Sequence, residues 1–148
     1  SEALLSYFAG VANLGARVDV SVGRSPAVLQ LRDLNADGLP DLIGVYQEQT
    51  GSVVRVALGR KGGDFGRDME YPATKEVYGM AVDDVDGDGK PDVVLANFNE
   101  STLRVLKNLG GGMLKAQPDL KTGAYPTAVV SAPLTRGAAR PALIRART

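Results

Sequence analysis

One acidic nonapeptide occurs twice in this chain, at residues 33–41 and 84–92, and the two copies lie 51 residues apart. In both copies, oxygen-bearing side chains stand at loop positions 1, 3, 5 and 9, with glycine at position 6 and proline at position 8. Self-similarity at a period of roughly 20–50 residues is typical of repeat architectures, in which each copy is one small structural unit. The duplication therefore constrains the fold and the candidate site together.

The similarity extends beyond the two loops into the flanking apolar segments. Short extended runs precede and follow each loop, and a glycine-rich turn then separates a third run from a fourth. The expected strands lie at 26–33, 42–46, 52–58 and 69–71, and again at 77–84, 93–97, 101–106 and 118–121. Runs this short, separated by turn signals, argue against helices and predict an all-β protein. Four-stranded antiparallel units of about 50 residues favour β-propeller blades, with a β-sandwich as the main alternative.

The repeat also predicts the organisation of the chain. We expect a half blade at 1–25, whole blades at 26–75 and 76–125, and a degenerate half blade at 126–148. The third copy has lost every carboxylate, and Arg136 and Arg140 stand near the expected anions, so no cation site is predicted there. Three blades are not expected to close into a propeller ring. The expected assembly is a partial propeller, or a propeller completed by a homodimer.

Composition excludes several functions for a chain of 148 residues. The chain has no Cys and no His, which excludes disulfides, zinc–thiolate sites and Ser-His-Asp catalysis within it. Its 17 basic residues balance its 17 acidic residues, and the bases are too scattered to predict nucleic-acid binding. No stretch approaches the ~18 apolar residues of a transmembrane helix, so no membrane span is expected.

The D-x-[DN]-x-D-G-x-P-D loop, with an apolar strand on either side, resembles the FG-GAP or VCBS-type repeat. This is the repeat of the integrin α-subunit propeller and of many bacterial surface and secreted proteins. The segment Gly63-Asp64-Phe65-Gly66 resembles the G-x-F turn of that repeat. The resemblance covers roughly residues 18–144 and is strong in two repeats. It implies a β-propeller, Ca²⁺ in the loops between the first and second strands, and no intrinsic catalysis.

Two Ca²⁺ sites are therefore predicted, because Ca²⁺ takes 6–8 oxygen ligands in irregular geometry. The side chains at positions 1, 3, 5 and 9 and the backbone carbonyl at position 7 are the predicted ligands. They are Asp33, Asn35, Asp37, Leu39 and Asp41 in loop 1, and Asp84, Asp86, Asp88, Lys90 and Asp92 in loop 2. Loop 2 has four carboxylates against three in loop 1, and is expected to bind more tightly.

Two other interpretations of the loops are less consistent with the residues. An EF-hand needs a bidentate Glu at position 12, where this chain has Gly44 or Leu95. Ordinary acidic turns contain the same residue types for local hydrogen-bonding reasons, but two matching copies at equivalent places favour a metal.

The predicted function is a Ca²⁺-binding propeller module for recognition or adhesion, with a protein or carbohydrate partner. We expect an extracellular, cell-surface or periplasmic location, because extracellular Ca²⁺ fills loops of modest affinity. The chain is not expected to be an enzyme. The alternatives are the propeller portion of a polysaccharide lyase or hydrolase, with Glu48 and Glu100 as candidate acids, and a purely structural spacer.

Overall fold

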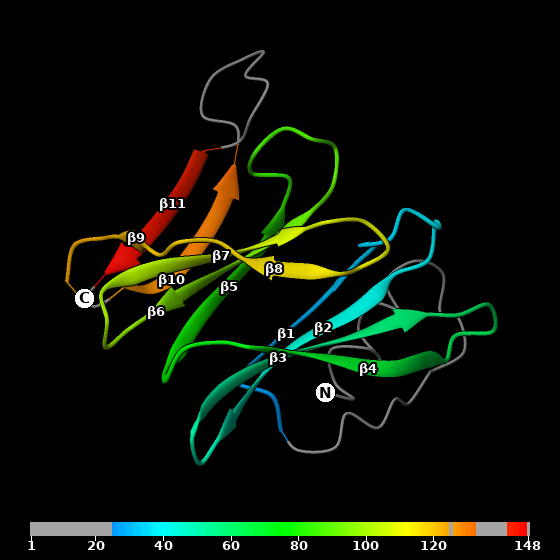
Figure 1. Ribbon diagram of the computed structural model, residues 1–148, viewed down its shortest axis with the longest axis horizontal. Helices are drawn as coiled ribbons and strands as arrows, with labels where there is room; N and C mark the ends of the chain where they lie inside the picture. Colours follow the sequence, from blue (N-terminus) through cyan, green and yellow to red (C-terminus); the bar gives the residue numbers. More distant parts are fainter. Residues whose placement is uncertain (1–24, 125, 133–141, 148) are drawn as a thin grey trace, which may run out of the picture.

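The computed structural model describes residues 25–124, 126–132 and 142–147, and every regular element in these ranges is a β-strand (Figure 1). The all-β prediction is confirmed. Within this described part, no helix is long and apolar enough to cross a membrane. The half blade predicted at 1–25 lies, except for its last residue, outside the described residues. So does the loop predicted around Arg136 and Arg140.

The first sheet has four antiparallel strands in sequence order. These are β1 (Val28–Arg32), β2 (Asp41–Glu48), β3 (Gly51–Gly59) and β4 (Phe65–Pro72). Loop 1 connects β1 to β2, so the acidic nonapeptide lies at one end of the first hairpin. The sheet is the four-stranded unit that the sequence pattern predicts.

The second sheet repeats this order with β5 (Val77–Asp83), β6 (Asp92–Asn97), β7 (Thr102–Asn108) and β8 (Leu114–Ala116). A fifth short strand, β9 (Leu120–Lys121), also pairs with β7. Loop 2 connects β5 to β6, in the place that loop 1 has in the first sheet.

The fourth segment of the second unit differs from the single strand predicted at 118–121. It is split into β8 and β9, and both parts pair with β7. Gln117 still donates its backbone N–H to the Val105 carbonyl at 2.8 Å, but Pro118 has no N–H to continue the ladder. The proline explains the interruption.

A third, two-stranded sheet follows, made of β10 (Pro126–Ala132) and β11 (Ala142–Arg147). Strand β5 packs beside β1 on one side and beside β10 on the other. The first strands of three successive units therefore lie next to one another, as Figure 1 shows. This arrangement is consistent with part of a propeller, whose blades pack around a common axis.

The core lies between successive sheets, and β6 is buried on both faces. Val93 and Leu95 of β6 belong to the cluster shared with Ile43 and Val45 of the first sheet. Val94 belongs to a second cluster on the opposite face, towards β10. Because successive side chains of a strand alternate between faces, one β6 strand supplies both cores. Each fully buried Val or Leu contributes roughly 1.5–3 kcal/mol.

Each of the two main sheets has an ion pair of its own, and the two pairs lie at equivalent positions. Arg55 of β3 bonds to Glu70 at 2.8 Å, and Arg104 of β7 bonds to Asp119 through two contacts of 2.8 Å. In each pair the acid follows the arginine by 15 residues. Arg55 also lies over the Tyr46 ring, 4.8 Å from its centre. Each pair ties the third strand of its unit to the segment that follows.

Candidate metal centre

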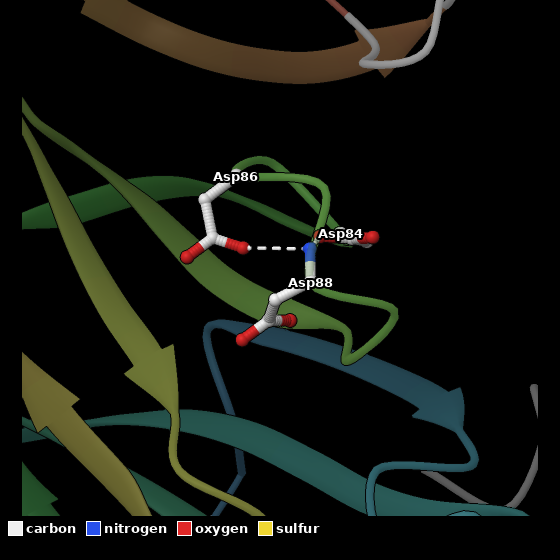
Figure 2. A group of neighbouring side chains, drawn as sticks. All are labelled: Asp84, Asp86 and Asp88. Carbon is white, nitrogen blue, oxygen red and sulfur yellow. Dashed lines mark hydrogen bonds between the residues drawn. The ribbon is translucent and has the colours of Figure 1, made fainter.

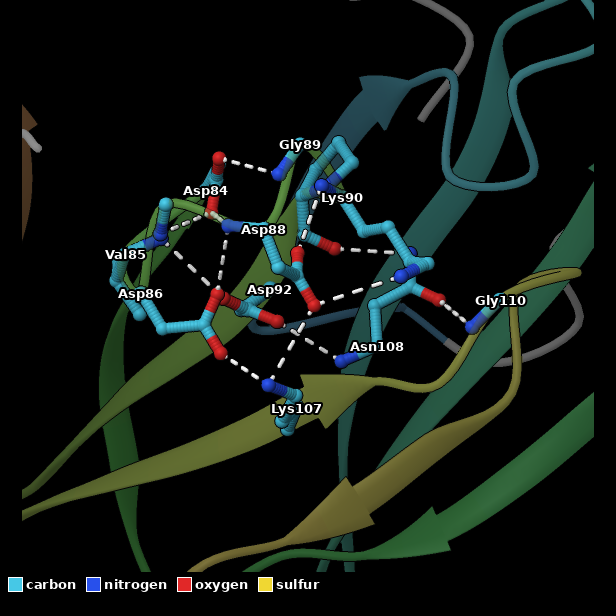
Figure 3. A network of polar contacts seen from close by, with 12 residues as sticks. Asp84, Val85, Asp86, Asp88, Gly89, Lys90, Asp92, Lys107, Asn108 and Gly110 are labelled. Atoms are coloured by element: carbon cyan, nitrogen blue, oxygen red, sulfur yellow. Dashed lines mark hydrogen bonds and ion pairs between the residues drawn. The ribbon is translucent and has the colours of Figure 1, made fainter. Parts of the chain in front are cut away.

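Loop 2 curls around the carboxylate of its first residue (Figure 3). Asp84 Oδ1 accepts the backbone N–H of Asp88 at 3.1 Å, and its Oδ2 accepts that of Gly89 at 2.8 Å. The same N–H of Asp88 also reaches Asp86 Oδ1 at 3.1 Å, and Lys90 N–H donates to Asp88 Oδ1 at 2.9 Å. These local bonds gather the side chains of positions 1, 3 and 5 at one end of the blade.

The three carboxylates of loop 2 form a compact group. Figure 2 shows Asp84, Asp86 and Asp88, each of which offers one oxygen within 4.8 Å of the others. The three side chains are half-buried or exposed, so an ion has access from solvent. Carboxylate oxygens in a flexible loop are hard ligands of the kind that Ca²⁺ prefers. The donor set therefore fits one calcium ion.

Loop 1 has the same internal bonds. Asp37 N–H donates to Asp33 Oδ1 at 3.3 Å and to Asn35 Oδ1 at 3.1 Å, and Gly38 N–H donates to Asp33 Oδ2 at 2.9 Å. Leu39 N–H donates to Asp37 Oδ1 at 2.8 Å. Asn35 thus places an amide oxygen where loop 2 places a carboxylate. The backbone N–H bonds to the side chains of positions 1, 3 and 5 therefore correspond in the two loops.

Two positions of each loop adopt the left-handed backbone conformation. The glycine at position 6 has φ of +83° at Gly38 and +86° at Gly89, a conformation that glycine adopts at no steric cost. Position 4 was not predicted to be special, yet φ is +81° at Gly87 and +62° at Ala36. Gly87 in the second copy was the one sequence feature that could have indicated a left-handed conformation at position 4.

The position 9 aspartates are almost fully buried and tie each loop to the end of the third strand. In loop 1, Asp41 Oδ2 accepts the N–H of Leu34 at 2.6 Å, and Oδ1 accepts that of Gly59 at 2.8 Å. In loop 2, Asp92 accepts the N–H of Val85 at 3.2 Å and that of Asn108 at 2.8 Å. Burial raises the pKa of Asp92, and these two N–H donors oppose that effect.

Each Asp41 or Asp92 oxygen keeps a second lone pair. The role of both residues as calcium ligands stays a prediction, as does that of the carbonyls of Leu39 and Lys90. What the geometry adds is a structural role for position 9, since its carboxylate closes the loop against the neighbouring strand.

A family model for the FG-GAP-like repeat matches residues 84–136. The chain carries an FG-GAP-like repeat. The match begins at Asp84, the first residue of loop 2. Loop 1 lies outside the match but has the same pattern of backbone hydrogen bonds as loop 2. No curated protein and no solved structure matches the chain.

The matched segment contains a residue that joins the two loops and that no sequence pattern predicted. Asn108, at the end of β7, is fully buried. Its Nδ2 donates to the carbonyl of Leu34 in loop 1 at 2.7 Å and to that of Pro91 in loop 2 at 3.0 Å. Its Oδ1 accepts the N–H of Gly110 at 2.9 Å. One side chain therefore holds both acidic loops together across the interface between the sheets.

Two lysine side chains lie beside the loop 2 carboxylates, and neither was predicted to have a role there. Lys107 of β7 bonds to Asp86 Oδ2, and its Nζ lies 3.4 Å from Asp88 Oδ2. Lys90 Nζ lies 3.5 Å from the same Asp88 oxygen. The bond from Lys107 lowers the pKa of Asp86, and the N–H of Lys90 lowers that of Asp88. Both carboxylates are therefore held in the charged form that binds a cation.

Proposed function

We propose that this chain is a Ca²⁺-binding propeller module of the FG-GAP-like type, which serves recognition or adhesion outside the cytoplasm. The observation that carries the proposal is the Asp84, Asp86 and Asp88 group, with oxygens within 4.8 Å of one another in a loop whose bonding pattern recurs in loop 1. Asp33, Asn35 and Asp37 make the second site. A protein or carbohydrate surface is the proposed partner.

The proposed role of the ion is structural. Each loop joins the first two strands of a blade, and carboxylates gathered at one point repel each other unless a cation offsets their charge. A bound Ca²⁺ stabilises the folded loop, because the unfolded chain has no preformed site. Extracellular calcium modules have Kd on the order of 10⁻⁴–10⁻³ M, which suits a location where Ca²⁺ is abundant.

Calorimetric titration of the full chain with Ca²⁺, paired with thermal unfolding in Ca²⁺ and in chelator, tests the proposal. With free Ca²⁺ at tenfold above Kd, each site adds about 1.4 kcal/mol to stability. Asp88→Asn should abolish binding in loop 2, and Asp37→Asn should abolish it in loop 1. Asp68→Asn, the same change at an exposed position of β4, should leave both sites intact.

Three results would overturn the proposal. One is the absence of heat on Ca²⁺ titration together with a melting temperature that chelator does not change. A second is loss of binding in Asp68→Asn equal to that in Asp88→Asn. The third is equal stabilisation by Mg²⁺, because Mg²⁺ requires a tighter octahedral site and keeps its waters.

The enzymatic alternative depended on Glu48 and Glu100. Glu48 Oε1 accepts a bond of 3.2 Å from Arg55 Nη2, and Glu100 lies in the turn between β6 and β7. This alternative stays a prediction, which turnover of a polysaccharide panel would test. Completion of a ring by two copies also stays a prediction, and the solution mass in Ca²⁺ tests it.

A further inference from the structure

The two sheets differ at the strand position from which Lys107 reaches loop 2. Gly59 and Asn108 are equivalent, because each ends the third strand of its sheet and donates its N–H to the position 9 aspartate. The residue before each of them is therefore also equivalent. It is Leu58 in the first sheet and Lys107 in the second. One repeat places an apolar side chain at this position and the other places a cation.

This difference accompanies a second one inside the loops. Position 3 is Asn35 in loop 1 and Asp86 in loop 2, which has one carboxylate more. Lys107 bonds to that additional carboxylate, at Asp86 Oδ2. The first repeat thus has two neutral residues, Asn35 and Leu58, at the positions where the second repeat has the charged pair Asp86 and Lys107. The lysine offsets the single carboxylate by which loop 2 exceeds loop 1.

The ammonium is held among the predicted calcium ligands. Besides Asp86, its Nζ lies 3.4 Å from Asp88 Oδ2, and the Lys107 side chain is only 34% exposed. Figure 3 shows Lys107 reaching from β7 towards both carboxylates. The more exposed Lys90, at 45%, contacts Asp88 alone. A metal ion in loop 2 and the Lys107 ammonium would therefore compete for the same carboxylate oxygens, those of Asp86 and Asp88.

We propose that Lys107 is a tethered competing cation that holds loop 2 in its folded form at low Ca²⁺ and weakens Ca²⁺ binding there. This inference depends on the proposed calcium function. Ca²⁺ binds in loop 2 only when the ammonium of Lys107 moves away from at least one carboxylate. In the first repeat the equivalent residue, Leu58, has no charge and cannot compete with Ca²⁺. Loop 2 is consequently weaker than its carboxylate count alone predicts, and the two sites fill at more similar Ca²⁺ concentrations.

The test is Ca²⁺ titration of the full chain carrying Asp37→Asn, so that loop 2 alone responds. Lys107→Met keeps the length of the side chain and removes its charge. A unit charge about 5 Å from a divalent ion, even in a water-like dielectric, changes affinity roughly tenfold or more. We expect Lys107→Met to lower Kd by at least this factor. In chelator the same variant should melt at a lower temperature, because its carboxylates are no longer offset.

Two further variants separate this mechanism from a general charge effect. Lys121→Met makes the same change near the other end of the β7 ladder, about 16 Å away along the strand, and should leave Kd unchanged. Asn35→Asp, made with loop 2 inactivated by Asp88→Asn, adds a fourth carboxylate to loop 1 without a lysine. It should strengthen binding in loop 1.

The outcomes distinguish this inference from the proposed function. If loop 2 takes up no Ca²⁺ in either the parent or Lys107→Met, the calcium function itself is wrong for that loop. If loop 2 binds Ca²⁺ with a Kd that Lys107→Met leaves unchanged or raises, the calcium function stands and the competitor role is overturned. An equal gain in Lys121→Met would overturn it as well.

Discussion

Replacing Asn108 by Ala is the sharpest test of how the two blades are joined. The side chain is fully buried and makes three hydrogen bonds, to the carbonyls of Leu34 and Pro91 and from the N–H of Gly110. Each intramolecular bond contributes about 1 kcal/mol net, and a buried partner left unsatisfied costs about 1–3 kcal/mol. We therefore expect Asn108→Ala to lower the free energy of unfolding by about 3–4 kcal/mol. In a domain of this size that is a fall in Tm of roughly 10 °C or more.

The assay is thermal and urea unfolding of the full chain in chelator, so that metal binding does not contribute. Asn99→Ala is the matched control, because Asn99 lies exposed in the turn between β6 and β7. It should change stability by less than about 0.5 kcal/mol. Asn108→Asp keeps the acceptor for Gly110 but loses both donors, and should be at least as unstable as the alanine variant. A Tm within about 2 °C of wild type for Asn108→Ala would refute the reasoning.

Three further changes test local features of the fold by thermal unfolding. Gly59→Ala should lower the free energy of unfolding by about 1–3 kcal/mol or more, since a Cβ there would lie 2.3 Å from the Pro40 carbonyl oxygen. An unchanged Tm would contradict that close approach. Gly87→Ala should cost about 1 kcal/mol, because φ is +81°, and a gain in stability would contradict the left-handed loop. Asp119→Asn should cost about 1 kcal/mol by weakening the two-contact pair with Arg104, and salt should reduce the difference.

The repeat and its acidic loops were predictable from the sequence because both are local patterns. Alternating apolar residues and turn signals specify strands, and the loop residues that bond to one another lie within seven positions along the chain, as from Leu34 to Asp41. The left-handed glycines follow from the same local geometry. The split of the fourth strand near Pro118 was not predicted, although the missing N–H of the proline is itself a local cause.

The contacts that complete the site were decided by tertiary structure. Asn108 reaches Leu34 across 74 positions, and Lys107 reaches Asp86 across 21 positions, from a strand that only the blade register brings beside the loop. A carboxylate pattern states how many oxygens are available. It does not state which of them a neighbouring ammonium already holds, because a charge interaction depends on distance in space rather than on separation along the chain. The sequence by itself determined that two acidic loops exist and where they lie in each blade, while packing decided how they are joined and how their charges are offset.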